Sequence, residues 1–135
     1  MDADGRQLRG LTILVAEGDA RFARILADLI ALYGGTAAGP AASEAAALGI
    51  VDAMPVDGVI LNIRLREGAG FSLAGALTGR GIPVFLIAGD GPAAIPAACI
   101  DLPVFTMPFS LSDLVERLAA DCRAVTAARG EPGRA

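Results

Sequence analysis

The sequence predicts one α/β domain in which helices cover both faces of a parallel β-sheet. Five short apolar segments of strand length recur along the chain, and helical patterns alternate with them. The five segments show no polar alternation, which is typical of strands buried on both faces of a sheet. The expected strand order is 2-1-3-4-5, which places a functional crevice at the carboxyl ends of the first and third strands.

The first two strand–helix units are indicated by apolar spacing and by helix ends. Leu11 to Ala16 is a continuous apolar run, and the helix predicted from Ala20 to Tyr33 ends at a pair of glycines. Thr36 to Gly39 is a short strand, and a second helix follows with Ser43 as its N-cap. The apolar residues expected to face the core on these helices are Phe22, Ile25, Leu26, Leu29, Ile30, Tyr33, Ala47, Ile50, Val51 and Met54.

The third strand is apolar on both faces and the fourth is apolar throughout, which fits the centre of a sheet. Gly58 to Asn62 is the third strand, and Pro83 to Ala88 is the fourth. The helix predicted between them runs from Gly70 to Arg80 and turns three apolar residues inward, Phe71, Ala74 and Leu77. The preceding stretch, Glu67 to Gly70, is expected to be a flexible loop.

The last third of the chain is less regular. A fourth helix is expected within residues 89–102, but Pro96 interrupts it, so this helix should be short or irregular. Val104 to Thr106 is the fifth strand, and Ser110 caps the last helix. The buried face of that helix is marked by Leu111, Leu114, Val115, Leu118, Cys122 and Val125.

The composition predicts a cytoplasmic globular domain. The 135 residues fit one domain over 11–127, between a flexible arm over 1–10 and a disordered tail over 128–135. Hydrophobic residues make up 54% of the chain and the net charge is −4, without the basic clusters that a nucleic-acid surface needs. No apolar run approaches the ~18 residues of a membrane span, and no signal peptide is expected.

Histidine and cysteine usage narrows the chemistry. Histidine is absent, which removes the commonest general base and the commonest transition-metal ligand. The two cysteines, Cys99 and Cys122, lie far apart in apolar surroundings and are expected to be buried free thiols. Since the sequence shows neither metal-ligand spacing nor a pair of nucleophile and base, it predicts a protein that is not an enzyme.

Several segments, in this order and spacing, resemble the receiver domains of bacterial response regulators. Glu17-Gly18-Asp19 is similar to the acidic end of the family's first strand, and Gly58 to Leu65 is similar to its central strand. Gly39 to Ser43 resembles the start of the second helix in one subgroup of single-domain receivers, and Met107 to Ser110 resembles the family's Lys-Pro-Phe motif. The resemblance covers about residues 11–120 and implies a flavodoxin-like (βα)5 receiver fold.

The resemblance breaks at the positions that carry the family's chemistry. Receivers hold magnesium with two adjacent acids and with the aspartate that accepts phosphate. Here those positions carry Glu17-Gly18, with Asp19 beside them, and Asn62. The family's hydroxyl position is Ala88 and its lysine position is Met107. An amide is a poor nucleophile towards phosphorus, so the sequence predicts a degenerate pocket without phosphoacceptor or catalytic residue, and with weak or absent magnesium binding.

The conformational switch of the family is altered as well. The hydroxyl and aromatic switch positions match Ala88 and Val104, so their coupling is missing. Loss of the acids together with the lysine leaves a nearly neutral pocket, since a lone buried cation would be costly. Two interpretations stay open: the pocket is simply packing, or it holds one receiver conformation fixed without phosphate. The Met107-Pro108 bond matches a peptide that is cis in receivers.

The resemblance implies a stand-alone receiver in two-component phosphorelay signalling that acts through protein–protein contact. Its partner would be a histidine kinase or another signalling protein, and a homodimer is also expected. In receivers the face built from the fourth helix, the fifth strand and the fifth helix makes such contacts. Here that face is expected within about residues 90–120 and includes Val104, Asp113, Glu116 and Arg117. The alternatives are a sensor of a small molecule bound in the neutral crevice around Asn62, and phosphotransfer by an unusual route.

Overall fold

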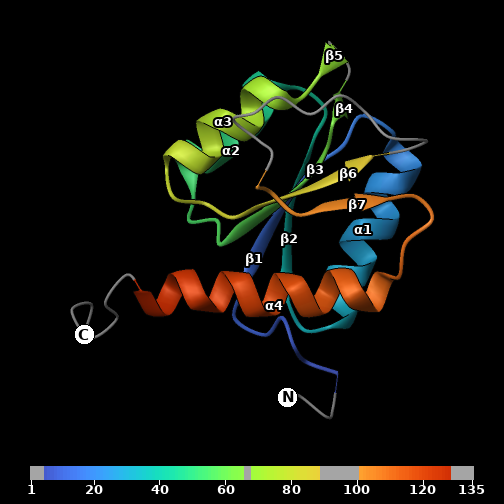
Figure 1. The fold of residues 1–135 in the computed structure, drawn as a ribbon, viewed down its shortest axis with the longest axis vertical. Helices are drawn as coiled ribbons and strands as arrows, with labels where there is room; N and C mark the ends of the chain where they lie inside the picture. Colours follow the sequence, from blue (N-terminus) through green and yellow to red (C-terminus); the bar gives the residue numbers. More distant parts are fainter. Residues whose placement is uncertain (1–4, 66–67, 89–100, 129–135) are drawn as a thin grey trace.

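A parallel five-stranded sheet forms the centre of the molecule, in the order β2-β1-β3-β6-β7 (Figure 1). The computed structural model describes residues 5–65, 68–88 and 101–128. The strands of the sheet are β1 (Thr12–Ala16), β2 (Thr36–Ala41), β3 (Gly58–Asn62), β6 (Val84–Ala88) and β7 (Val104–Thr106). Since β6 and β7 are the fourth and fifth strands of this sheet, the predicted 2-1-3-4-5 order is confirmed.

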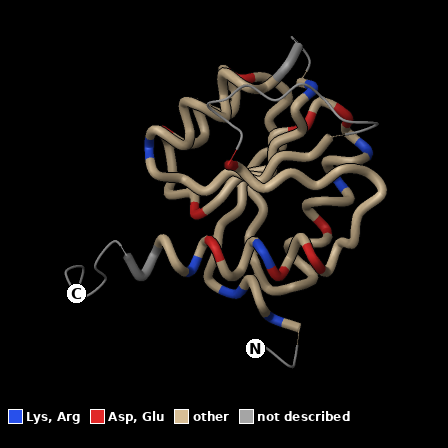
Figure 2. Tube along the Cα trace, in the orientation of Figure 1, with Lys and Arg blue, Asp and Glu red and all other residues tan. Residues whose placement is uncertain are grey.

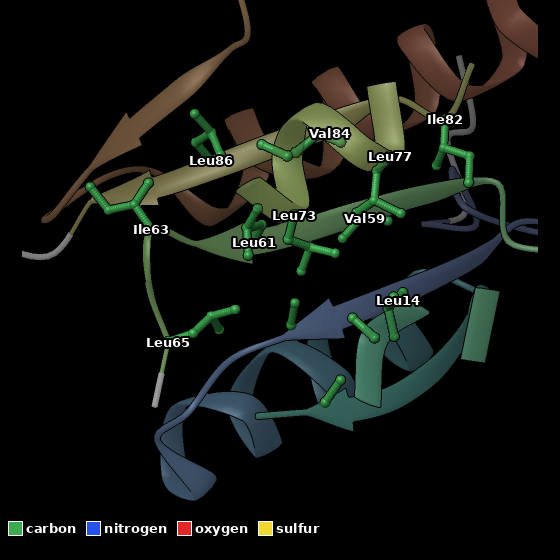
Figure 3. Packing of buried hydrophobic residues seen from close by; sticks show 14 of the residues in the cluster. Leu14, Val59, Leu61, Ile63, Leu65, Leu73, Leu77, Ile82, Val84 and Leu86 are labelled. Atoms are coloured by element: carbon green, nitrogen blue, oxygen red, sulfur yellow. The ribbon is translucent and has the colours of Figure 1, made fainter. Parts of the chain in front are cut away.

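The helices of the described residues cover both faces of the sheet (Figure 1). Two apolar layers result, because successive side chains of a strand point to opposite faces. One layer packs α1 (Ala20–Leu32) and α4 (Leu111–Ala128) against the sheet, and the other packs α2 (Glu44–Ala53) and α3 (Phe71–Gly79). Figure 3 shows the second layer, in which side chains of β1, β3 and β6 meet those of α3; the labelled members include Leu14, Val59, Leu61, Leu73, Leu77 and Leu86.

The helix starts follow the signals in the sequence. The Ser43 side chain accepts a hydrogen bond from the Ala46 backbone N–H at 3.1 Å, which makes it the N-cap of α2. The Ser110 hydroxyl accepts from the Asp113 N–H at 3.2 Å at the start of α4. These bonds satisfy backbone donors that have no partner within the helix, so both predicted caps are confirmed.

Three side chains that the sequence placed in the core, Ile25, Met54 and Leu111, are substantially exposed, and so is Met107. The buried stripe of α1 is centred on Ala23, Leu26 and Ile30, which leaves Ile25 on the flank of the helix with half of its surface exposed. Met54 is the C-cap of α2 and has extended backbone, so it leaves the helical stripe. Leu111 and Met107 lie at the start of α4 and after β7, at the edge of the packed layer.

The N-terminal segment packs against the domain, in contrast to the loose arm predicted over residues 1–10. Within its described part, 5–10, the Leu8 side chain is fully buried in the layer under α1 and α4. The Leu8 N–H donates to the Tyr33 carbonyl at 2.9 Å, and the Arg123 guanidinium of α4 donates to the Gln7 carbonyl. Burial of the apolar Leu8 side chain favours the packed position of this segment.

A second, two-stranded sheet follows β3. The strands β4 (Arg64–Leu65) and β5 (Gly68–Ala69) pair antiparallel, and β5 falls within the stretch predicted to be a loop, Glu67 to Gly70. The predicted fourth helix falls on residues 89–102, of which 89–100 lie outside the described residues, as do Cys99 and the tail beyond Ala128. Among the residues that are described, no helix has the length and apolar character needed to cross a bilayer.

Candidate functional site

The carboxyl ends of β1 and β3 bring the two central site residues together. Glu17 directly follows β1, and Asn62 is the last residue of β3. The two strands are neighbours in the sheet, with Ala16 in register with Leu61. Because parallel strands end at one edge of the sheet, the side chains that follow β1 and β3 share a corner. Glu17 and Asn62 therefore meet at the corner where the strand order predicts the crevice.

The Glu17 carboxylate is buried and both of its oxygens are occupied. Asn62 Nδ2 donates a hydrogen bond to Glu17 Oε1 at 2.9 Å, and the Asp19 backbone N–H donates to Glu17 Oε2 at 2.9 Å. Only 4% of the Glu17 surface is exposed. A buried carboxylate is costly unless donors satisfy it, and here neutral donors from the chain itself do so.

The Asn62 side chain uses both ends of its amide. While Nδ2 donates to Glu17, Oδ1 accepts from the Arg64 backbone N–H at 2.8 Å. Asn62 therefore links the end of β1 to the start of β4. An ionised aspartate at this position would accept but not donate, and it would place a second negative charge against Glu17.

Asp19 caps a helix, and Gly18 offers no side chain, at the positions beside Glu17. Asp19 Oδ1 accepts from the backbone N–H groups of Arg21 at 2.8 Å and of Phe22 at 3.3 Å, which makes Asp19 the N-cap of α1. Gly18 has no side chain to add. Among the described residues, no group of three or more acidic, cysteine or histidine side chains is arranged to hold a metal. The acidic side chains of this corner, Glu17 and Asp19, thus both accept hydrogen bonds from the chain itself.

Ala88 and Met107, the positions of the family's hydroxyl and lysine groups, lie at the same edge of the sheet as Glu17 and Asn62. Ala88 ends β6 and is buried, and its carbonyl accepts from the Met107 N–H at 3.0 Å. The Met107-Pro108 bond is cis, as predicted. Neither position carries a hydroxyl or an ammonium group. Moreover, the sequence holds no lysine at all, so no neighbouring lysine can replace the one that the family carries at the position of Met107.

Asp57 is the other carboxylate near β3, and it lies at the opposite end of the strand. It precedes Gly58, and its Oδ2 accepts from the Thr12 backbone N–H at 2.7 Å. Thr12 is the first residue of β1, whereas Glu17 follows the last. Asp57 therefore cannot replace an aspartate at position 62.

The residues predicted to bind a partner lie on β7 and α4. Asp113, Glu116 and Arg117 are exposed and line a shallow groove of about 350 Å³ together with Phe105. Val104 lies on the same strand as Phe105 and is 36% exposed. Arg117 also pairs with Asp121 on its own helix, at 2.7 Å.

Comparisons with known proteins place this arrangement in context. No family model matches the chain, and no curated protein does. Among solved structures, SdrG from Sphingomonas melonis Fr1 is 30% identical, with a TM-score of 0.71 over 84% of this chain and 96% of SdrG. The receiver domain of the TMAO respiratory system response regulator TorR is 23% identical, with a TM-score of 0.75 over 85% and 98%. A putative response regulator from Chloroflexus aurantiacus J-10-fl is 21% identical, with a TM-score of 0.71 over 82% and 98%.

Proposed function

Because this chain belongs to the response-regulator receiver domains, we propose that it serves two-component signalling by binding another protein in one fixed conformation, without being phosphorylated. One observation carries the proposal, the hydrogen bond from Asn62 to the buried Glu17 carboxylate. That bond occupies the corner where the family resemblance places the metal and the phosphoacceptor. The protein is then a binding module and not an enzyme.

The absence of phosphorylation follows from the chemistry of the corner. The Asn62 amide is a poor nucleophile, and one end of it is already bound to Glu17. Phosphoryl transfer depends on positioning and on stabilisation of charge, for which Ala88 and Met107 offer no group. Each missing group would lower the rate by orders of magnitude, so restoring one alone would not restore the reaction.

The fixed conformation follows from the same contacts. Asn62 holds the end of β1 and the start of β4 at once, and the contact needs no ion or modification. The bond between the Met107 N–H and the Ala88 carbonyl joins the ends of β7 and β6. In receivers a hydroxyl and an aromatic side chain couple phosphorylation to a change of conformation. These positions are Ala88 and Val104 here, so the coupling side chains are missing.

Intact-mass spectrometry after treatment with acetyl phosphate and magnesium tests the proposal. We expect no added mass, while a receiver that carries the acceptor aspartate, treated in parallel, gains a phosphoryl group. A gain of about 80 Da, one phosphoryl group, on this chain would contradict the proposal. The same experiment tests the alternative of phosphotransfer by an unusual route.

We propose that the partner, a histidine kinase or another signalling protein, contacts the face formed by β7 and α4. Val104 is an exposed apolar residue of β7, and the next residue, Phe105, shares a groove with the charged Asp113, Glu116 and Arg117 of α4. A mixture of apolar and charged side chains is typical of protein interfaces. A second copy of the chain is one partner this face can accept. Size-exclusion chromatography with light scattering at high concentration should then show a dimer that Val104→Asp disrupts. Leu32→Asp, at an apolar residue of α1 that is 72% exposed, is the matched control.

A small ligand in the crevice around Asn62 remains the alternative. It requires a molecule that competes with Asn62 for Glu17 or binds beside their hydrogen bond. A thermal-shift screen that finds a stabilising compound, with the effect lost in Asn62→Ala, would favour it over a module that binds only proteins.

A further inference from the structure

One exposed row of side chains on α4 carries opposite charges at its two ends. Asp113, Glu116, Ala120 and Arg123 follow one another at intervals of three or four residues, which places them on one face of the helix. All four residues are exposed, in contrast to the opposite, buried face of α4. Figure 2, in which α4 lies in the same place as in Figure 1, shows acidic and basic positions along this helix. We call this row the α4 ridge.

The acidic end of the α4 ridge has no partner within the part of the chain that the structure describes. The backbone N–H of Asp113 donates to Ser110, but the side chains of Asp113 and Glu116 make neither an ion pair nor a hydrogen bond there. The two carboxylates lie one helical turn apart and repel each other. A cation brought to this end of the ridge from outside would therefore be stabilised.

The basic end of the α4 ridge keeps hydrogen-bond donors for a partner. Arg123 donates to the backbone carbonyls of Gln7 and Arg9, and both bonds come from Nη2. A guanidinium has five N–H donors, so these two bonds leave those on Nε and Nη1 unused. Among the described residues no carboxylate pairs with Arg123. The two carbonyls thus hold the guanidinium in place without neutralising its charge.

The two ends of the α4 ridge cannot neutralise each other within one chain. Glu116 and Arg123 are seven residues apart in α4, which corresponds to about 10 Å along a helix. In an antiparallel pair of α4 helices, however, Glu116 of each copy can lie opposite Arg123 of the other. The two-fold axis of such a pair passes between Ala119 and Ala120, whose small side chains permit a close approach of the helices.

We propose that two copies of this chain associate through their α4 ridges in antiparallel orientation, with Glu116 of each copy paired with Arg123 of the other. This inference rests on the proposed function, in which the face of β7 and α4 accepts a second copy, and it assigns the geometry of that contact. Complementary charge sets orientation and register, since exposed ion pairs add little affinity. Apolar area comes from Ala120 and from Phe105, which line one groove.

Two charge reversals, Glu116→Arg and Arg123→Glu, test this arrangement. Each variant alone should dimerise at least about tenfold more weakly than the wild type, because both symmetry-related pairs change from attraction to repulsion. An equimolar mixture of the two variants should restore the dimer, since every ridge position then faces the opposite charge again. Size-exclusion chromatography with light scattering, over a range of concentrations, compares the wild type, the two variants and the mixture.

Asp101→Arg is the matched control, because it makes the same change of charge at an exposed position outside α4. It should change the affinity of the dimer by less than about twofold, since distant surface charges are screened by salt. Circular dichroism verifies that each variant is folded. If Arg123→Glu does not fold, Glu116→Arg still decides the question, because the Glu116 side chain has no contact within the described chain to lose.

Three results would overturn the proposal: a wild type that is monomeric at high concentration, a dimer that Glu116→Arg weakens no more than Asp101→Arg does, or a mixture that associates no better than the separate variants. None of these results bears on phosphorylation, which the intact-mass experiment above decides separately.

Discussion

At the scale of single residues, the most consequential difference from the family is Asn62, which stands where receivers carry the aspartate that accepts phosphate. Its amide supplies a donor to a buried carboxylate and an acceptor to a backbone N–H. Only a side chain with both functions satisfies this corner without a cation. The identity of residue 62 thus determines both the chemistry and the local structure.

Asn62→Asp should lower the free energy of unfolding by about 1–3 kcal/mol in the absence of divalent cations, because two carboxylates replace a donor–acceptor pair. Millimolar magnesium should recover part of the loss, since the new pair can bind the ion. Urea unfolding with and without magnesium measures both effects. Asn62→Ala, which adds no charge, should not respond to magnesium. An Asn62→Asp variant as stable as the wild type without magnesium would contradict this view of the corner.

Gly58 is confined by Cys122 of α4. A Cβ atom on Gly58 would lie 2.5 Å from Cys122 Sγ, and both residues are buried. Gly58→Ala should therefore destabilise the fold by about 1–3 kcal/mol through overpacking. The double variant with Cys122→Ala should lose less stability than the sum of the single variants. Strictly additive losses in urea unfolding would show that the two side chains do not compete for space.

The Cys122 thiol should make the free energy of unfolding depend on pH in the alkaline range. Burial, and then the carboxylates of Asp57 and Asp121, raise its pKa from 9.0 to about 12, against a smaller opposing effect of Arg123. Above pH 9.0 the thiol of the unfolded chain loses its proton while the folded chain retains it. Stability should thus fall as the pH rises, by at most about 1.4 kcal/mol per pH unit from this group.

Urea midpoints of the wild type and of Cys122→Ala, measured from about pH 8 to about pH 11, isolate this contribution. The wild type should lose stability more steeply than the variant. Parallel pH profiles would show that the folded and unfolded thiols titrate alike.

At the scale of elements, the main strands and the helix caps were predictable from the sequence. The β4–β5 pair and the packing of the N-terminal segment were not. The bounds of β3 and β7 match the predicted ones because apolar runs of strand length mark them. The pairing of β4 with β5 was missed, since each strand has only two residues and no apolar pattern. The burial of Leu8 was missed because one apolar residue in a polar segment carries no periodicity.

Leu8→Ala tests whether the N-terminal segment is part of the folded unit. The side chain is fully buried, so its truncation should cost about 2–5 kcal/mol. Leu32→Ala, at a leucine of α1 that is 72% exposed, should cost far less. Thermal or urea unfolding of the two variants measures the difference. Equal, small effects would restore the prediction of a loose arm.

At the scale of the whole molecule, each end of β1 is joined to a segment distant in the sequence or packed on the domain. The buried pair of Glu17 and Asn62 follows the carboxyl end of β1, and the N-terminal segment that carries buried Leu8 precedes its amino end. Strand order predicted that Glu17 and Asn62 would meet. It did not predict their hydrogen bond, which depends on the side-chain geometry of residues 45 positions apart.

The fixed conformation, held without phosphate, is a property of the whole domain. A backbone amide NMR titration with magnesium, followed by beryllium fluoride as a mimic of the phosphoryl group, tests it most directly. We predict that the amides of Glu17, Asn62, Ala88 and Met107 do not move at millimolar magnesium or on addition of beryllium fluoride. Concerted, saturable shifts of these amides would show a pocket that still binds metal and phosphate, and would contradict the proposal that the domain works without phosphorylation.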